Sequence, residues 1–312
     1  MKTIVSIRFY ADNIPGGADA ILGPTQCGPD VAEVMKFGDG VKCAVTVKVH
    51  LTLDEGDERI AKVRALLAEY GAEEFTNRRE VYTEEDLQNA PLLYIGSWLM
   101  YRVSAGLGYG TTYDLSNACK KCGTGVRQTS PLVISGDDER SLEKMHVAAT
   151  VHGELLVHDV VGEKLVNANV TGLNLWRIYS KRKSIANVEL RREQIFAENV
   201  LPPMAPASTL DRKDVCPICR RGHFSFLEDV PARIVYRADD LKNIQDMNLT
   251  WEWFTRFGTI PEDAVERGMW PAPSLLVTPK VMNLLRGKTK KEKKYEGVSF
   301  TPVWIEGQTP WG

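Results

Sequence analysis

The chain has 312 residues, of which 43% are hydrophobic and 26% are charged, as in a globular protein that can bury a full core without disulfides. Its 39 basic and 41 acidic residues leave a formal net charge of −2, which argues against a dedicated nucleic-acid-binding protein but leaves room for a local basic patch. The longest apolar runs, such as 90–95, are far below the roughly 20 residues of a membrane span, and charges at Arg8 and Asp12 come too early for a secretory signal, so a cytoplasmic protein is predicted.

The clearest strand signal lies at 41–53, after a first predicted strand at 1–10. Apolar side chains occupy every second position from Val41 to Leu53, and polar side chains stand between them at 42, 46, 48, 50 and 52. This period of two predicts one buried and one solvated face, which favours an antiparallel sheet. Cys43 falls on the buried side, and we expect Cys43 and Cys27 to be ordinary thiols.

The segment after this strand has helical spacing. Asp57 is placed to cap the helix and Gly71 to end it. Its predicted apolar face consists of Ile60, Val63, Leu66, Leu67 and Tyr70. Thr83 and Asp86 resemble a capping pair, which predicts a short helix, and 92–100 predicts another strand.

Two loop-rich segments lead to the two C-x-x-C motifs of the chain. The first motif lies within 105–125, and the second follows 202–215, where prolines and charged residues indicate a linker. These features predict an N-terminal α+β region at 1–104 and two C-x-x-C regions at 105–201 and 202–312.

A weak internal repeat follows the two motifs. Residues 155–157 and 275–277 both read Leu-Leu-Val, and each precedes a segment with Val and Leu at helical spacing. Gly172 or Gly297 and a last predicted strand then complete each unit. Leu-Leu-Val is a common string, so chance similarity stays open beside internal duplication. If the repeat is real, the two cysteine pairs occupy equivalent positions and can meet at one metal ion.

The two motifs supply four thiol ligands: Cys119, Cys122, Cys216 and Cys219. Two cysteines three positions apart on a tight turn can both face one ion, and structural zinc takes four ligands in a tetrahedron. Zinc ribbons place such pairs roughly 15–20 residues apart, whereas 93 residues separate Cys122 from Cys216 here. The cost of closing a loop grows only with the logarithm of its length, so one shared structural Zn²⁺ is the favoured interpretation.

Other interpretations of the cysteines stay open. Thioredoxin-like redox chemistry is disfavoured because neither motif opens a helix after a buried strand. Two unrelated or metal-free pairs are the remaining possibility. His223 follows Cys219 closely and is a candidate substitute ligand, although a loop histidine is the favoured interpretation. The neighbouring Lys120, Lys121, Arg220 and Arg221 would offset the net −2 charge of a zinc tetrathiolate.

Three further features carry weaker predictions. His146, His152 and His158 recur every six residues and could form an acid–base or metal cluster. The dense basic run Lys288–Lys294 is interpreted as a solvated loop, with a phosphate-binding or partner-facing loop as the alternative. The aromatic stretch 251–257 predicts a helix packed on the core, through the spacing of Trp251 and Phe254.

Several of these motifs together resemble a known family. The double C-x-x-C frame, Gly-Thr-Thr-Tyr-Asp at 110–114, Cys-Pro-Ile-Cys at 216–219 and the late Leu-Leu-Val…Gly-Val-x-Phe-x-Pro-Val ending are similar to bacterial double-CxxCG proteins. The resemblance covers about 105–306. Arg220 departs from the pattern, since it stands where the second motif of the family has Gly.

The resemblance implies function by binding rather than by catalysis. Proteins of that family are associated with contact-dependent and polymorphic toxin systems and are regarded as immunity proteins. We therefore expect an α+β protein with antiparallel sheets and short helices around one structural zinc, which neutralises a protein toxin. A nucleic-acid-associated zinc protein that uses Lys288–Lys294 and the basic residues beside the cysteines is the first alternative, and a hydrolase around the three histidines is the second.

Overall fold

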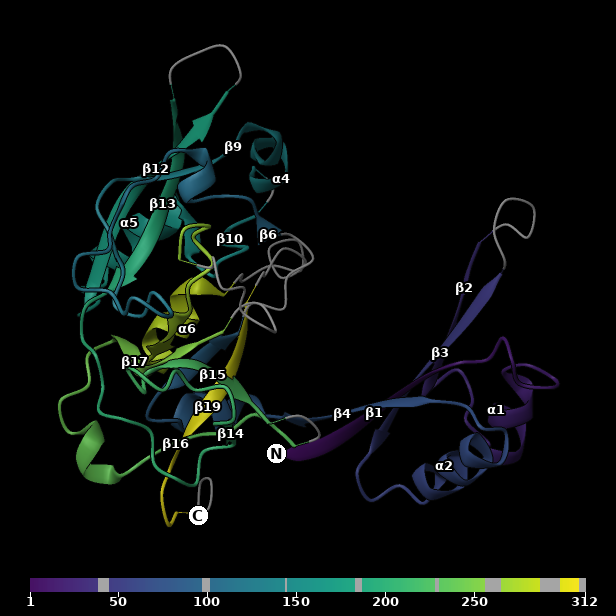
Figure 1. The fold of residues 1–312 in the computed structure, drawn as a ribbon. Helices are drawn as coiled ribbons and strands as arrows, with labels where there is room; N and C mark the ends of the chain where they lie inside the picture. Colours follow the sequence, from purple (N-terminus) through teal and green to yellow (C-terminus); the bar gives the residue numbers. More distant parts are fainter. Residues whose placement is uncertain are drawn as a thin grey trace. The chain divides into compact units, whose positions relative to one another are not determined.

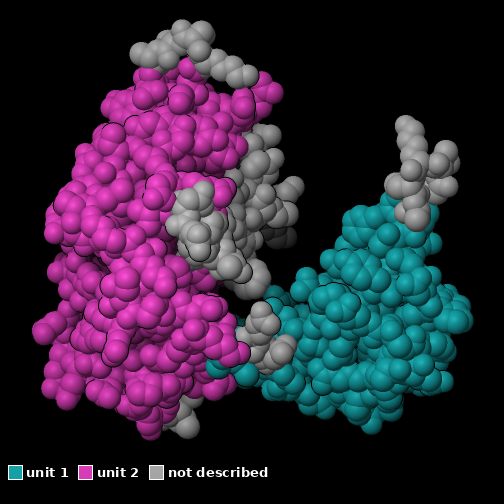
Figure 2. Space-filling model, in the orientation of Figure 1, with its two compact units in different colours: residues 1–83, 227–232 teal, residues 84–226, 233–312 magenta. Residues whose placement is uncertain are grey.

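The computed structural model describes 1–38, 45–96, 102–143, 145–182, 187–227, 230–255, 265–286 and 298–308, and the account below concerns these residues. The chain is a mixed α+β protein built mostly of strands (Figure 1). It forms two compact units, coloured separately in Figure 2. Unit 1 comprises Met1–Thr83 with Leu227–Ala232, and unit 2 comprises Glu84–Phe226 with Arg233–Gly312. The division of the chain into 1–104, 105–201 and 202–312, expected from the sequence, remains a prediction.

Unit 1 is a four-stranded antiparallel sheet in the order β2-β3-β1-β4, with two helices (Figure 1). Its elements are β1 (Lys2–Tyr10), α1 (Asp19–Thr25), β2 (Ala32–Phe37), β3 (Thr46–Asp54), α2 (Arg59–Glu69) and β4 (Glu74–Val81). This β-α-β-β-α-β connection is that of the ferredoxin-like topology. Side chains from both helices and from one face of β1 and β3 form a single buried cluster. The helices therefore cover one face of the sheet.

The periodic segments of unit 1 fold as their sequences predict. Alternate side chains of β3, including Val49 and Leu51, are fully buried. Asp57 accepts a hydrogen bond from the backbone N–H of Arg59 at 2.9 Å and so caps α2, and Gly71 follows the helix with φ +64°. The start of the predicted strand, 41–44, lies outside the described residues.

Unit 2 contains two larger sheets and a small two-stranded one. Its elements up to the second cysteine motif are α3 (Glu84–Asn89), β5 (Leu93–Gly96), β6 (Arg102–Val103), η1 (Leu107–Tyr109), β7 (Tyr113–Asp114), β8 (Arg127–Gln128), β9 (Leu132–Ser135), η2 (Gly136–Asp138), α4 (Glu139–Leu142), β10 (Val147–Thr150), β11 (Leu155–His158), α5 (Asp159–Asn167), β12 (Leu173–Lys181), β13 (Val188–Ala197) and β14 (Leu210–Asp211). The elements after it are β15 (Gly222–Phe226), β16 (Ile234–Tyr236), η3 (Ala238–Leu241), β17 (Met247–Phe254), β18 (Ala272–Val277), α6 (Pro279–Leu285) and β19 (Ser299–Ile305).

The two large sheets of unit 2 share a topology. The six-stranded sheet contains the order β9-β12-β13-β11-β10, and the seven-stranded sheet contains β16-β19-β5-β18-β17. In each series the first pair is parallel and every later pair is antiparallel. Strand β5 comes before all the other strands of both sheets in the chain. In the second sheet it occupies the place that β13 occupies in the first.

The strand–helix–strand units expected after each cysteine motif are present. The first is β11-α5-β12 and the second is β18-α6-β19. Val161 and Leu165 of α5 are buried, as are Val281 and Leu285 of α6. Gly297 lies outside the described residues.

Two sequence predictions for unit 2 are wrong. The segment 202–215 is not a free linker, because Met204 and Ser208 are buried and the backbone N–H of Ala205 donates to Val235 O at 2.8 Å. The aromatic stretch around Trp251 and Phe254 is part of strand β17 rather than a helix. Burial alternates along β17, so packing between strands overrides the three-residue spacing of its large rings.

Candidate metal centre

Each C-x-x-C motif lies in a turn between two short paired strands. Cys119 and Cys122 lie between β7 and β8, whose Tyr113 pairs with Gln128. The second motif lies between β14 and β15, where Leu210 pairs with Phe226. Both motifs are therefore presented by a hairpin, in the form of a zinc knuckle.

The backbone hydrogen bonds of the two turns are similar, although the bond donated by the first cysteine of the motif spans one residue more in the second turn. The N–H of Cys119 donates to Thr124 O at 2.8 Å, and the N–H of Cys216 donates to Gly222 O at 3.0 Å. In the first turn the N–H of Gly123 donates to Cys119 O at 2.7 Å, and in the second the N–H of Arg220 donates to Cys216 O at 2.8 Å. Gly123 and Arg220 both have positive φ, +74° and +54°. Arg220 thus adopts the left-handed conformation that glycine provides in the first turn.

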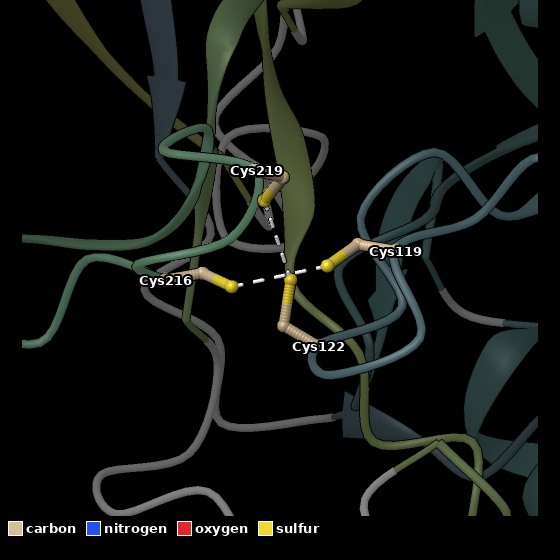
Figure 3. A group of neighbouring side chains, drawn as sticks. All are labelled: Cys119, Cys122, Cys216 and Cys219. Atoms are coloured by element: carbon tan, nitrogen blue, oxygen red, sulfur yellow. Dashed lines mark hydrogen bonds between the residues drawn. The ribbon is translucent and has the colours of Figure 1, made fainter.

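The four cysteine sulfurs converge on one point (Figure 3). All four Sγ atoms lie within 4.8 Å of one another. The Sγ atoms of Cys119 and Cys216 are 3.8 Å apart, and those of Cys122 and Cys219 are 3.6 Å apart. A tetrahedron with metal–sulfur bonds of about 2.3 Å has sulfur–sulfur edges of about 3.8 Å. The cluster therefore has the size and ligand number for one metal ion, and a tetrahedral four-sulfur set is typical of zinc.

The cluster is tightly enclosed by its own turns. Cys122 and Cys216 are buried, and the Thr124 hydroxyl lies 3.1 Å from the Cys122 sulfur. A Cβ atom added at Gly222 would collide with the Thr124 hydroxyl and lie 3.0 Å from the Cys122 sulfur. Gly222 is required here by close approach, since no side chain fits between the two turns. Trp270 packs against Gly123 on the other side and forms an edge contact with Tyr113, with ring centroids 5.0 Å apart.

The thiols of the cluster differ electrostatically. Burial raises the pKa of the Cys122 thiol far above its ordinary value. Burial also opposes ionisation of Cys219, but hydrogen bonds from the backbone of Arg221, from the Cys122 side chain and from the backbone of Gly222 outweigh it and lower its pKa to about 7. These hydrogen bonds thus favour the thiolate form of Cys219, which is the form that binds a metal.

The four cations predicted beside the sulfurs do not behave alike. Arg221 is half-buried, donates from Nε to Trp251 O at 2.7 Å and lies over the Trp251 ring at 5.4 Å. Lys120, Lys121 and Arg220 are exposed. Only Arg221 is therefore held in place close to the cluster, where its charge acts on Cys219.

Cys27 and His223 lie outside this ligand group. The four-cysteine set is complete without His223, and burial lowers the pKa of that histidine. Cys27 is buried in the core of unit 1, as expected of an ordinary thiol. Cys43 lies outside the described residues.

The three histidines considered as an alternative site do not come together. His146 and His158 face each other at the base of the β10–β11 hairpin, where the N–H of His158 donates to His146 O at 3.0 Å. His152 lies in the turn at the other end of that hairpin. Among the described residues, the cysteine cluster is the only group of three or more His, Cys, Asp or Glu side chains placed to hold a metal. The basic run Lys288–Lys294 lies outside the described part of the chain.

Sequence reasoning missed the second layer of the centre. Thr124 stands beside a predicted ligand, but nothing in the sequence indicates that its hydroxyl reaches the Cys122 sulfur. Trp270 and Trp251 are distant along the chain and reach the turns only through β17 and the segment before β18. The close approach at Gly222 is the one feature with a sequence signal, since glycine soon after the second cysteine occurs in both motifs.

Comparison with protein-family models, with curated proteins and with solved structures finds no match. In the described parts of the chain, no helix is long and apolar enough to cross a membrane.

Proposed function

We propose that the chain is a cytoplasmic, non-catalytic binding protein whose unit 2 is held together by one structural Zn²⁺. The observation that carries this proposal is the convergence of four sulfurs from two separate hairpins. Four protein ligands fill a tetrahedral zinc, so no position remains for a substrate or an activated water. The centre then acts as a cross-link between the first and second halves of unit 2.

The burial of the ligands supports a structural role. Two of the four sulfurs belong to buried residues, and the turns that hold them pack against each other at Gly222. Without the metal, the Cys122 thiol, whose pKa is raised, and the Cys219 thiol, whose pKa is lowered, would face each other at this interface. Zinc binding energy therefore contributes directly to the free energy of folding of unit 2.

Replacing a single ligand tests the zinc centre. We expect wild-type protein to contain one zinc per chain by elemental analysis. Cys216→Ser should lose the zinc and lower the melting temperature by more than about 10 °C, because metal-binding energy is folding energy. Cys27→Ser is the matched control, since Cys27 is a buried thiol outside the cluster. Near-wild-type melting of Cys216→Ser would contradict a structural zinc.

We further propose that the binding partner is a protein toxin. The support is the resemblance of the two cysteine motifs and of the C-terminal strand to immunity proteins. The direct test has two steps: the genes next to this one are searched for a toxin, and cells that co-express this chain with that toxin are then scored for survival. Protection by wild-type protein and by Cys27→Ser is expected, and its absence at normal expression of folded protein would contradict the proposal.

We infer that unit 2 arose by internal duplication. The support is the shared strand order and orientation of the two large sheets, with a hairpin-borne cysteine pair in each half. Chance similarity of Leu-Leu-Val alone would not reproduce the helix after the same strand or the parallel pair at the same edge.

A further inference from the structure

The sheet of unit 1 has one face that its helices leave uncovered. Inward side chains such as Val5, Ile7 and Phe9 pack on α1 and α2, so the alternate side chains of the same strands lie on the opposite face. The registers place these outward side chains in rows across the sheet. The outward set comprises Lys2, Ile4, Ser6, Arg8, Tyr10, Glu33, Met35, Phe37, Thr46, Lys48, His50, Thr52, Asp54, Phe75, Asn77, Arg79 and Val81, and we call it the open face.

Aromatic rings are exposed on the open face. Tyr10 is 49% exposed, Phe75 is 44% exposed and Phe37 is 52% exposed. The rings of Tyr10 and Phe75 meet edge to face with centroids 6.4 Å apart. Contiguous exposed apolar surface marks interaction sites, and the neighbours of the Tyr10–Phe75 pair indicate what it binds.

Cations surround these rings. Arg8 pairs across the sheet with Phe75 on one side and His50 on the other, and Tyr10 pairs with Lys48. In the described part of the chain, Arg8, Lys48 and Arg79 form no ion pair. Burial lowers the pKa of His50, and the charges of these three cations lower it further against the opposing effect of Glu33. Glu33 and Asp54 are the acidic side chains on this face, and Asp54 is paired with Lys2 at 2.9 Å. Glu33 alone is left to offset Arg8, Lys48 and Arg79, so the face has a positive potential.

The rings and cations meet at a depression in the sheet surface. It has a volume of about 160 Å³ and is lined by Arg8, Phe9, Tyr10, Lys48 and Phe75. A base that enters it can stack on an exposed ring while its phosphates lie beside guanidinium and ammonium groups. An inorganic anion would use the cations alone and leave the rings without a role.

We propose that the open face of unit 1 binds single-stranded nucleic acid, with bases stacked on Tyr10 and Phe75 and phosphates paired with Arg8, Lys48 and Arg79. Four-stranded sheets that bind RNA use the same division of labour, in which aromatic side chains on the sheet surface stack two or three bases. The near-neutral charge of the whole chain is compatible with this, because the basic side chains are concentrated on one face. The proposal concerns unit 1 and is independent of the toxin partner proposed above.

Fluorescence anisotropy with the full chain tests this proposal. The probes are labelled 12-nucleotide oligo(U) and oligo(dT), titrated at about 50 to 200 mM salt. Wild-type protein should bind with a log–log salt slope of about −2, since each of three neutralised phosphates of a single strand contributes about −0.7. Tyr10→Ala and Phe75→Ala should each weaken binding at least fivefold at unchanged slope, because each removes a stacking surface.

The charge variants have a separate signature. Arg8→Gln and Lys48→Gln should each reduce the salt slope by about 0.7. Tyr70→Ala and Lys62→Gln are the matched controls, because both residues lie on or next to α2, on the helical side of the sheet, and are exposed. They should leave both affinity and slope unchanged.

Three outcomes would overturn the proposal. The first is no binding of either oligonucleotide at 50 mM salt by a protein with a wild-type melting temperature. The second is binding that the four open-face substitutions leave unchanged, which would assign it to another part of the chain. The third is binding to vesicles of anionic phospholipid without binding to oligonucleotide, which would assign the face to a membrane surface.

Discussion

At the scale of single residues, the second cysteine turn contains a strained arginine. Arg220 has φ +54° at the position where the first turn has Gly123. The left-handed conformation costs a non-glycine residue roughly 1–2 kcal/mol. After Arg220 the chain turns back, so that Gly222 O accepts from the N–H of Cys216 at 3.0 Å, and we assign the strain to this closure of the metal turn.

Arg220→Gly is therefore expected to stabilise the protein. The gain should be about 0.5–1 kcal/mol, because relief of strain exceeds the extra chain entropy that glycine loses on folding. The measurement is urea unfolding at a fixed zinc concentration. Lys121→Gly is the control, since Lys121 lies in the first turn without positive φ, and it should destabilise by a similar amount. Lower stability of Arg220→Gly would show that the side chain itself contributes to the turn.

The ligand residues could be predicted from the sequence, and their surroundings could not. The spacing of the cysteines in the two motifs identifies them as candidate metal ligands even when the fold is unknown. The hydroxyl of Thr124 and the ring of Trp270 contribute through position alone, and a threonine or tryptophan at these sites looks like any other in the sequence. The strain at Arg220 was visible only as a departure from the glycine of the first motif.

At the scale of elements, Asp246 joins the two halves of unit 2. Its carboxylate accepts hydrogen bonds from the N–H of Thr171 at 3.0 Å, from the hydroxyl of Thr278 at 2.9 Å and from Lys280 at 2.9 Å. Thr171 precedes β12 of the first sheet, whereas Thr278 and Lys280 begin α6 of the second half. Burial would raise the pKa of Asp246, but Lys280 and the other donors outweigh it and hold the pKa below 3.8.

Asp246→Ala should destabilise unit 2 by about 1 kcal/mol, because a carboxylate that is only 15% exposed is lost and the half-buried hydroxyl of Thr278 loses its acceptor, whereas Thr171 and Lys280 are exposed and can bond to water instead. A carboxyl group with a lowered folded-state pKa stabilises at every pH above its unfolded value, here 3.8, and loses this effect only as pH falls below it. The cost measured by urea unfolding should thus be constant from about pH 5 to pH 8.

Asp239→Ala provides the comparison for Asp246→Ala. Asp239 pairs with Lys242 at 2.8 Å, but both side chains are largely exposed, so its loss should cost less than about 0.5 kcal/mol. Equal costs for the two substitutions, or a cost of Asp246→Ala that changes between pH 5 and pH 8, would contradict the assigned role.

Elements with a strong period could be predicted, and those defined by distant packing could not. β3 and α2 follow from apolar periods of two and of three to four. In β17 the three-residue spacing of Trp251 and Phe254 is the same as that on one face of a helix. The segment is a strand because it pairs with β15 and β18. The prolines of 202–215 indicate a linker, yet Met204 and Ser208 are held by the sheet beside them.

At the scale of the whole molecule, β5 makes the second sheet dependent on the first half of the chain. This strand lies between β18 and β19, although the other strands of that sheet all come from residues after 209. All strands of the six-stranded sheet, in contrast, lie within 102–197. No local pattern could predict that 93–96 crosses to the later sheet, because its sequence fits any buried strand.

A chain divided between Pro206 and Ala207 tests this dependence, since both residues are exposed. The fragment 207–312 alone should remain unfolded because it lacks β5 and two of the four cysteines. Co-produced with 1–206 in the presence of zinc, it should form a folded complex with native-like circular dichroism. A cooperative unfolding transition from 207–312 by itself would contradict the assigned sheet order.

The central claim is that four sulfurs from two hairpins hold one zinc ion, and X-ray absorption at the zinc K-edge of the purified chain tests it most directly. The account predicts a single shell of four sulfur atoms at about 2.3 Å, with one zinc per chain. A shell containing nitrogen or oxygen, or protein isolated without metal and with the cysteines joined as disulfides, would contradict it.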